Sequence, residues 1–377
     1  MIYFDNAASG GRKPEIVLSA VASAIKVCAN PGRSGHKLAL SCANIVQQAR
    51  NATSDFFGGY GFDRVVFTKN CTEALNIALL GTLKKGDHVV VSCMEHNSVL
   101  RPLEYLKKAG VITYDVCGLR GEKENANVEP EDVRALLKPN TRLVAVSTAS
   151  NVNGAMPPLE KIKAILPKHV LFLCDGAQGG GHFPLSMQTL GADFLALAGH
   201  KGLMGIQGSG ALLFSERVDP TPILYGGTGS MSLSLDMPDF PPDSLEAGTI
   251  SYPAVVSLLE GVRYLKERLP QIQERLTALT AFFIDGVRAL RHCVLYSKAN
   301  PCGIVALKHS FLQSEYVSSV LSSKYDIATR GGLHCAPLMH EALGTLDDGL
   351  LRVSFSHFST EEEVEKLLLA LKEIDEI

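Results

Sequence analysis

An apolar run ends in a single lysine within the segment ADFLALAGHKGLMG, residues 192–205. Lys201 has a histidine before it and a glycine after it. Such a lysine either caps a strand at the protein surface or places a reactive amine in a desolvated site. Desolvation lowers the pKa of a lysine and makes its amine a usable nucleophile. Lys201 is therefore the first candidate for a catalytic residue.

Besides this run, 192–199, the sequence predicts apolar strands at 88–93, 142–148 and 170–175, and polar side chains close or follow each of them. Continuous Val, Ile and Leu runs separated by helices indicate a mainly parallel sheet covered on both faces. Ligands bind beyond the carboxyl ends of such strands. We therefore expect one shared site for the residues at those ends, which are His96, Asn151, Asp175, Gln178, His182, His200 and Lys201.

This combination of residues suits pyridoxal 5'-phosphate. The cofactor needs a lysine to hold its aldehyde as a Schiff base and an acid at its pyridine nitrogen, which Lys201 and Asp175 could supply. A helix is predicted over 72–84, and its N-terminus with the hydroxyl of Thr72 could bind the phosphate. His96 could stack on the pyridine ring, and Gln178 could donate a hydrogen bond to the phenolic oxygen.

The length of the chain and the change in its secondary-structure pattern after about residue 253 predict two domains. The chain has 377 residues, 46% of them hydrophobic, which is more than one core normally holds. We expect a large cofactor-binding domain over residues 1–252, whose first segment, 1–13, could pack on a smaller α+β domain over 253–377. The smaller domain is predicted from short strands near 303–308 and 350–355 and from long amphipathic helices at 254–269, 271–291, 313–324 and 360–375.

Charge and cysteine usage exclude several classes of protein. The net charge of −3 lacks the basic excess of a nucleic-acid-binding protein. The nine cysteines form no CxxC pair, which argues against a zinc ribbon or a redox pair and favours reduced thiols in a cytosolic protein. Without a signal peptide or a long apolar span, we expect a cytoplasmic enzyme that binds neither membrane nor nucleic acid and holds no metal.

The sequence resembles the class V aminotransferase superfamily of fold-type I pyridoxal phosphate enzymes, on the cysteine desulfurase and selenocysteine lyase branch. The resemblance spans nearly the whole chain. It implies an α/β fold with a mainly parallel seven-stranded sheet covered by helices, plus a smaller C-terminal α+β domain. It rests on the motifs YFDNAAS (3–9), CTEALN (71–76), EHNS (95–98), SNVNG (150–154), CDGAQGGGH (174–182), GHKGLMGIQGSGAL (199–212), EAGT (246–249) and RGGLHCAP (330–337).

The resemblance assigns cofactor roles by position. It makes Lys201 the Schiff-base lysine, Asp175 the partner of the pyridine nitrogen, Gln178 the donor to the phenolic oxygen and His96 the stacking ring. The phosphate ligands it implies are Thr72 and His200, and Cys71 beside them is expected among the cofactor-binding residues. It also implies a further phosphate contact, Thr249, delivered from a neighbouring subunit. The last of these implies a homodimer.

The resemblance also implies how the substrate is held. Asn151 and Arg352 match groups that bind the substrate carboxylate, a task that suits guanidinium geometry. Arg330 is expected beside the substrate. Cys335 matches the cysteine that attacks substrate sulfur, and positive charge on Arg330 and His334 could keep it as a thiolate.

The implied activity removes sulfur from cysteine, or selenium from selenocysteine, and leaves alanine. Lys201 would remove the α-proton, and Cys335 would become a persulfide that passes to an acceptor protein. Two departures from the family pattern, Ala198 and Cys71, each remove a hydroxyl expected near the phosphate.

Three alternatives stay open from the sequence. The first is another class V enzyme, an aminotransferase or a β-eliminating lyase, in which Cys335 has no covalent role. The second is a non-catalytic descendant that binds a partner. The third is a zinc site built from His334, Cys335 and His340, whose side chains are of zinc-ligand type.

Overall fold

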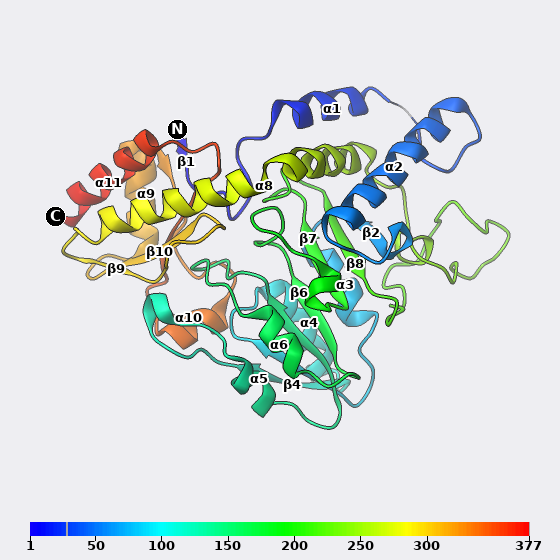
Figure 1. The fold of residues 1–377 in the computed structure, drawn as a ribbon, viewed down its shortest axis with the longest axis horizontal. Coiled ribbons are helices and arrows are strands. Elements are labelled where there is room, and N and C mark those ends of the chain that lie inside the picture. Colours follow the sequence, from blue (N-terminus) through cyan, green and yellow to red (C-terminus); the bar gives the residue numbers. More distant parts are fainter. Residues whose placement is uncertain (28, 377) are drawn as a thin grey trace.

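The computed structural model describes residues 1–27 and 29–376 and shows an α/β architecture around a seven-stranded sheet (Figure 1). The fold class predicted from the sequence is confirmed. In this sheet β8 runs antiparallel to both of its neighbours, and the remaining pairs are parallel. The strands in spatial order are β2 (Val65–Thr68), β8 (Gly210–Phe214), β7 (Phe194–Ala198), β6 (Leu171–Asp175), β5 (Thr141–Ser147), β3 (Asp87–Ser92) and β4 (Ile112–Cys117).

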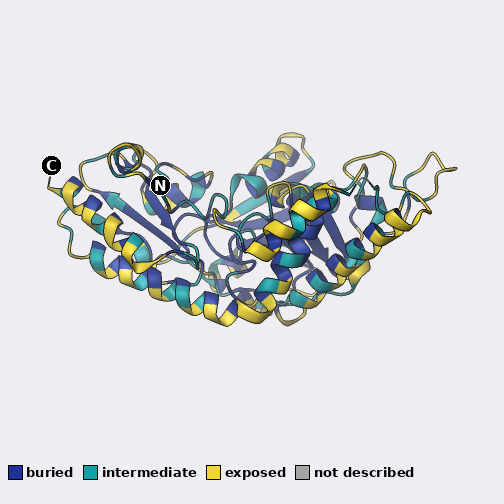
Figure 2. Cartoon of the chain, turned by 90° about the horizontal axis from the view of Figure 1, so that it is seen from above, coloured by how far each residue is buried: buried dark blue, intermediate teal, exposed yellow. Residues whose placement is uncertain are grey.

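The central strands are apolar on both faces because helices cover both faces of the sheet. All five residues of β7 are buried. Leu195 and Leu197 enter one core cluster, whereas Phe194, Ala196 and Ala198 enter the other. Figure 2 shows the strands as a buried interior with the exposed residues on the outer sides of the helices.

Helices from different parts of the chain form the two covering layers. On one side α3 (Cys71–Leu80) and α4 (Asn97–Lys108) pack together and bury residues against the sheet. On the other side lie α2 (Lys37–Phe56), α6 (Leu159–Ile165) and α7 (Met187–Leu190), which contribute to the larger core cluster. Two further segments, α1 (Glu15–Ile25) and α5 (Pro130–Ala135), complete the N-terminal two thirds.

The C-terminal third builds a second, antiparallel sheet in the order β12 (Leu351–Ser354), β10 (Ile304–His309) and β9 (Cys293–Leu295). It is accompanied by α9 (Ser314–Tyr325), α10 (Pro337–Leu343) and α11 (Glu361–Asp375). The N-terminal strand β1 (Ile2–Tyr3) pairs in parallel with β11 (Ile327–Ala328), so the start of the chain lies among these C-terminal elements (Figure 1). The domain boundary at 252/253 stays a prediction.

The prediction of two helices at 254–269 and 271–291 is wrong. A single helix, α8 (Tyr252–Val287), continues through Pro270 and extends past both sheets (Figure 1). A proline inside a helix costs about 3 kcal/mol because it removes a donor and crowds the preceding turn. Here the apolar stripe on both sides of the proline stays buried, at Leu265, Leu269, Ile272 and Leu276, which holds the helix together.

Other boundaries differ in smaller ways. The helix predicted at 72–84 begins at Cys71 and ends at Leu80, and its N-cap is Asn70, whose side chain accepts a hydrogen bond from the backbone of Glu73. Thr72 therefore lies within the first turn of the helix and does not cap it. The strands β2 and β4 were not identified from the sequence. Among the described residues, no helix has both the length and the apolar character needed to cross a bilayer.

Two helix glycines give a matched test of the packing around the Lys201 turn. A Cβ at Gly261 would overlap the carbonyl oxygen of Leu203, which is backbone, whereas one at Gly286 would meet the flexible end of Leu368. Alanine in a helix otherwise gains about 0.5–1 kcal/mol over glycine. We expect G261A to lower the free energy of unfolding by about 1–3 kcal/mol, as for an overpacked core, and G286A to change it much less. Urea denaturation measures both, and equal effects would contradict this packing.

Candidate active site

One cavity brings together ten residues that the sequence analysis placed in a site. They come from the start of α3, the loop before α4, the carboxyl ends of β5, β6 and β7, and the segment around β11 and β12. Residues that are far apart in the sequence thus line one cavity, as expected at the carboxyl edge of a parallel sheet. His182, which was expected at the same site, is not among the residues that line it. The ten are Cys71, Thr72, His96, Asn151, Asp175, Gln178, His200, Lys201, Arg330 and Arg352.

Lys201 follows β7 and its side chain lies in this cavity. Burial lowers the pKa of Lys201 from the ordinary value of a lysine, and the nearby Asp175 carboxylate opposes that shift. A second lysine lies close by and was not singled out from the sequence. Lys13 donates from Nζ to the carbonyl oxygen of His200 at 2.8 Å, and burial lowers its pKa to about 8.

Asp175 ends β6, and its carboxylate is oriented by two contacts to the same oxygen. Oδ1 accepts the backbone N–H of Ala177 at 2.9 Å and lies 3.4 Å from the sulfur of Cys71. Burial and the Asp175 charge raise the pKa of the Cys71 thiol well above its ordinary value, so Cys71 stays protonated and donates. Among the described residues no donor contacts Oδ2, which leaves that oxygen available to a ligand.

His96, which is expected to stack on the pyridine ring of the cofactor, is also held in a fixed orientation. The Nδ1 atom of His96 accepts the backbone N–H of Ser98 at 3.0 Å, and burial lowers the pKa of His96, so its ring is neutral. The Ser98 hydroxyl also lies 2.8 Å from the hydroxyl of Thr72. These contacts fix a flat ring and a hydroxyl beside the N-terminus of α3.

The donors in the cavity fit pyridoxal 5'-phosphate. A lysine with a lowered pKa, an oriented carboxylate, a neutral ring and a helix N-terminus are what the aldehyde, the pyridine nitrogen, the ring face and the phosphate each require. Gln178 lies in the same cavity with one polar atom unpaired. Its Nε2 donates to the carbonyl of Ala7 at 3.0 Å, while its buried Oε1 has no protein partner among the described residues and is available to a ligand. His200 contacts the hydroxyl of Ser9 at 3.1 Å.

The opposite wall carries two guanidinium groups on adjacent backbone segments. Arg330 and Arg352 pair through their backbones, and the Arg352 side chain is 1% exposed. Arg352 donates to Asp5 Oδ1 at 2.7 Å and to the carbonyl of Asn151 at 2.9 Å, while its buried Nε has no partner among the described residues. This wall can bind a carboxylate. Asp5 was quoted within the YFDNAAS motif but given no role.

Cys335 does not line this cavity but lies immediately outside it. The exposed thiol lines a groove that shares Thr72, His96 and Ser98 with the cavity. The carbonyl of Cys335 accepts the backbone N–H of Asn97 at 2.8 Å, and the carbonyl of His334 accepts from the Asn151 side chain at 2.7 Å. The thiol is thus carried on backbone tied to both α4 and the cavity wall.

The prediction that His334 supplies positive charge to this thiol is wrong. Burial, reinforced by the Arg352 charge, lowers the pKa of His334 well below its ordinary value, so the ring is neutral. Its Nε2 contacts the carbonyl of Leu350 at 3.0 Å. The zinc alternative has no structural support, since the described residues hold no group of three or more His, Cys, Asp or Glu side chains arranged for a metal ion.

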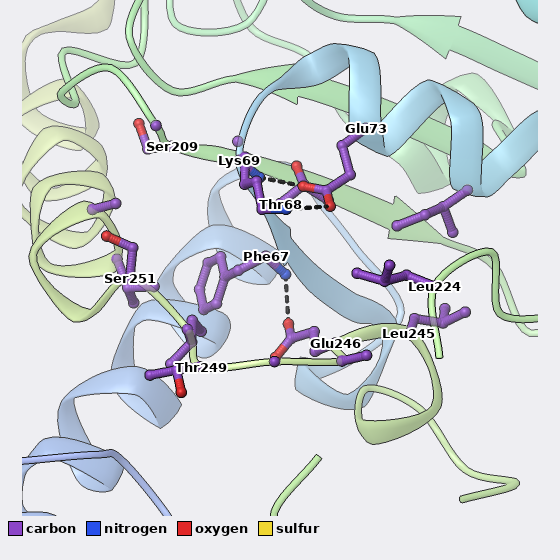
Figure 3. A pocket seen from close by; sticks show the side chains of 18 of the residues that line it. Phe67, Thr68, Lys69, Glu73, Ser209, Leu224, Leu245, Glu246, Thr249 and Ser251 are labelled. Carbon is purple, nitrogen blue, oxygen red and sulfur yellow. Dashed lines mark hydrogen bonds and ion pairs between the residues drawn. The ribbon is translucent and has the colours of Figure 1, made fainter. Parts of the chain in front are cut away.

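Thr249 lies in a different pocket from the other predicted phosphate ligands. Figure 3 shows it beside Ser251, on the segment that leaves Glu246. The Glu246 carboxylate accepts the backbone N–H of Phe67 at 2.6 Å and is paired with the buried Arg50 at 2.5 Å. The base of this segment is therefore fixed to α2 and β2. Delivery of Thr249 to a neighbouring subunit stays a prediction.

The comparisons with known proteins place this architecture in a family. The model of a protein family described as "Aminotransferase class-V" matches residues 2–367 of the chain.

The chain belongs to the aminotransferase class-V family.

This membership confirms the resemblance identified from the sequence motifs. A probable cysteine desulfurase of Pyrococcus abyssi is 31% identical over 99% of this chain and 94% of its own length, and a cysteine desulfurase of Klebsiella pneumoniae is 30% identical over 99% and 93%. The apo structure of a cysteine desulfurase from Thermococcus onnurineus has a TM-score of 0.90 at 32% identity, covering 100% of this chain and 94% of that one. The enzymes of this class V family depend on pyridoxal phosphate.

Glu95 is a buried carboxyl that the sequence analysis missed, although it belongs to the EHNS motif. It accepts hydrogen bonds from the hydroxyls of Ser92 and Ser147 and from the backbone of Ser147, which joins the ends of β3 and β5. Burial raises the pKa of Glu95 to about 8. Its position could have indicated a role, because it lies two residues beyond the predicted strand 88–93 and directly before His96, the histidine expected to stack on the cofactor.

This carboxyl predicts a pH dependence of stability. Between about pH 5 and 8 the folded protein keeps a proton on Glu95 that the unfolded chain has released, so the stability from this group falls as pH rises. E95Q stays neutral. Its free energy of unfolding relative to wild type should therefore increase across that window in urea titrations. The exposed Glu160→Gln serves as the surface control, and parallel curves for E95Q and wild type would contradict the assignment.

The thiols should differ sharply in reactivity. Cys335 is exposed, whereas Cys71 and Cys174 are buried and their thiol pKa values are raised by burial. Because the thiolate is the reactive form, brief treatment with iodoacetamide should alkylate Cys335 before either of them. Peptide mapping by mass spectrometry measures this order, and faster modification of Cys71 would refute it.

Proposed function

We propose that this chain is a pyridoxal 5'-phosphate-dependent cysteine desulfurase that converts L-cysteine to alanine and carries the released sulfur as a persulfide on Cys335. The observation that carries the proposal is the exposed Cys335 thiol, tied by backbone hydrogen bonds at the mouth of a cavity that holds Lys201 and Asp175. The desulfurases named among the relatives and the solved structures support the same activity.

The cofactor would be held by residues that already point at one space. Lys201 would hold its aldehyde, Asp175 its pyridine nitrogen, His96 its ring face and Gln178 its phenolic oxygen. The α3 N-terminus with Thr72 and His200 would hold the phosphate. Once bound, the cofactor withdraws electrons from the substrate α-carbon, which makes the α-proton acidic.

The substrate carboxylate would bind at the arginine wall. Arg352 is held by Asp5 and by the Asn151 carbonyl, so its guanidinium is oriented before substrate arrives. Arg330 adds charge on the same side, and Asn151 joins this wall to the Cys335 loop. Because these charged side chains are already held in position, binding the substrate carboxylate requires little further ordering of them. The amino acid is thus placed with its side chain toward Cys335.

Proton and sulfur movements follow from this placement. Lys201 has a lowered pKa and can take the α-proton as a base. The Cys335 sulfur attacks the substrate γ-sulfur and forms an S–S bond while the C–S bond breaks. The electron pair of the C–S bond stays on the substrate carbon, which takes a proton and becomes the methyl group of alanine. The thiol of Cys71 holds Asp175 in place and is not the nucleophile.

The same site would accept selenocysteine, because selenium leaves carbon more readily than sulfur does. We further propose that the enzyme is a cytoplasmic homodimer in which Thr249 contacts the phosphate in the neighbouring subunit. The exposure of Thr249 in a pocket separate from the Lys201 cavity supports this arrangement.

Replacing Cys335 tests the covalent role. C335A should lower alanine formation from cysteine roughly 100-fold or more, as loss of a nucleophile does, and leave the visible absorbance of the bound cofactor unchanged. C293A, which alters a thiol in the second sheet, is the matched control and should keep activity.

K201A should abolish the cofactor absorbance. If C335A keeps full activity on cysteine, the chain is another class V enzyme in which the thiol has no covalent role. A parallel assay with cysteine sulfinate and selenocysteine then identifies its substrate. If the wild-type protein binds no cofactor, the non-catalytic alternative holds.

A further inference from the structure

A groove between α3 and α4 includes Cys335 and adjoins the Lys201 cavity, with which it shares Thr72, His96 and Ser98. Its lining on α3 has a spacing of four residues, Thr72, Asn76 and Leu80, which places these side chains in one stripe. The facing stripe on α4 includes Ser98, Arg101, Pro102 and Tyr105. Eight residues of helix rise about 12 Å, so the groove is long enough for three or four residues of extended chain at about 3.3 Å each.

The groove presents a cation and an aromatic ring to solvent. Arg101 is exposed and has no hydrogen bond or ion pair among the described residues, and Tyr105 is 66% exposed. By contrast, the neighbouring Glu104 is already paired with Lys107 and Lys108. Tyrosine and arginine are the residues that most often dominate the energy of protein interfaces. Their exposure beside a reactive thiol indicates a surface that binds a partner.

Beyond Tyr105 the surface is basic. The backbone N–H of Gly86 donates to the carbonyl of Val111 at 2.9 Å, which brings the turn after α3 against the turn after α4. Lys84 and Lys85 are exposed in the turn after α3, and Lys107 and Lys108 are exposed at the end of α4. Lys107 and Lys108 are paired with Glu104, so among the described residues Arg101, Lys84 and Lys85 supply the unpaired positive charge beside the groove, on a chain whose net charge is −3.

We propose that this groove docks an acidic segment of a sulfur-acceptor protein and places the nucleophilic thiol of that segment at Cys335. The proposal rests on the proposed function, which makes Cys335 the sulfur carrier. Because Cys335 lines the groove rather than the cavity, an acceptor reaches the sulfur without entering the space that holds Lys201. Opposite charge would attract and orient the acceptor.

The transfer of sulfur from Cys335 to the acceptor thiol needs no added oxidant. The acceptor thiolate attacks the outer sulfur of the Cys335 persulfide, a new S–S bond forms, and the bond to Cys335 breaks. Cys335 leaves as a thiolate and the acceptor becomes the persulfide. One turnover thus returns Cys335 to the form that attacks the next substrate.

Two synthetic peptides test the groove. They share one cysteine and one length, but acidic residues flank the cysteine in the first and lysines in the second. The full-length holoenzyme is loaded with cysteine, and mass spectrometry measures persulfide on each peptide over time. The acidic peptide should accept sulfur about 10-fold faster at low salt, and its advantage should shrink as salt screens the charges.

Variants locate the effect on the surface. K84E/K85E and Y105A should each remove most of the preference for the acidic peptide, while alanine formation with dithiothreitol as the sulfur acceptor stays at the wild-type rate. The control K161E/K266E reverses two exposed lysines on α6 and α8 and should keep the preference. Unchanged alanine formation shows that the variants fold.

The outcomes separate the two proposals. If Cys335 forms a persulfide but both peptides accept sulfur equally, or the groove variants behave like the control, the groove proposal alone is overturned. If no persulfide forms on Cys335, both proposals fail.

Discussion

The structure depends on placing a lysine amine and a carboxylate at the buried carboxyl ends of two adjacent strands. Asp175 closes β6 and Lys201 follows β7, and the two strands pair in register. Burial disfavours the charge on the lysine, and the carboxylate limits that effect. The amine is thereby kept reactive inside the protein. A parallel sheet covered on both faces is what makes such a desolvated edge available.

The other functional groups are brought to this edge by contacts that cross the whole chain. The N-terminal segment starts in β1, which pairs with β11. Asp5 then binds Arg352 of β12, and the segment passes along the cavity. There Ala7 accepts from Gln178, and Lys13 donates to the carbonyl of His200. The arginine wall and the lysine turn are therefore linked by one continuous stretch of backbone. Under the proposed function, that stretch would support both the substrate-binding and the cofactor-binding residues.

The position of Cys335 separates two kinds of chemistry. Its loop is fixed to α4 and to Asn151, and its thiol faces a groove rather than the cavity. In the proposed reaction, carbon chemistry would proceed in the Lys201 cavity while sulfur leaves through the groove at Cys335. The neutral His334 beside it adds no charge.

The sequence alone determined the α/β class, the carboxyl-end site and its principal residues, because apolar runs and the polar residues that end them are local patterns. It did not determine the course of α8 through Pro270, the protonation of His334 or the burial of Glu95. Those depend on what packs against each group from elsewhere in the chain. The ion pair of Asp5 with Arg352 joins residues 347 positions apart. Only the tertiary structure could bring them together, because no local pattern records which distant partner a buried charge will meet.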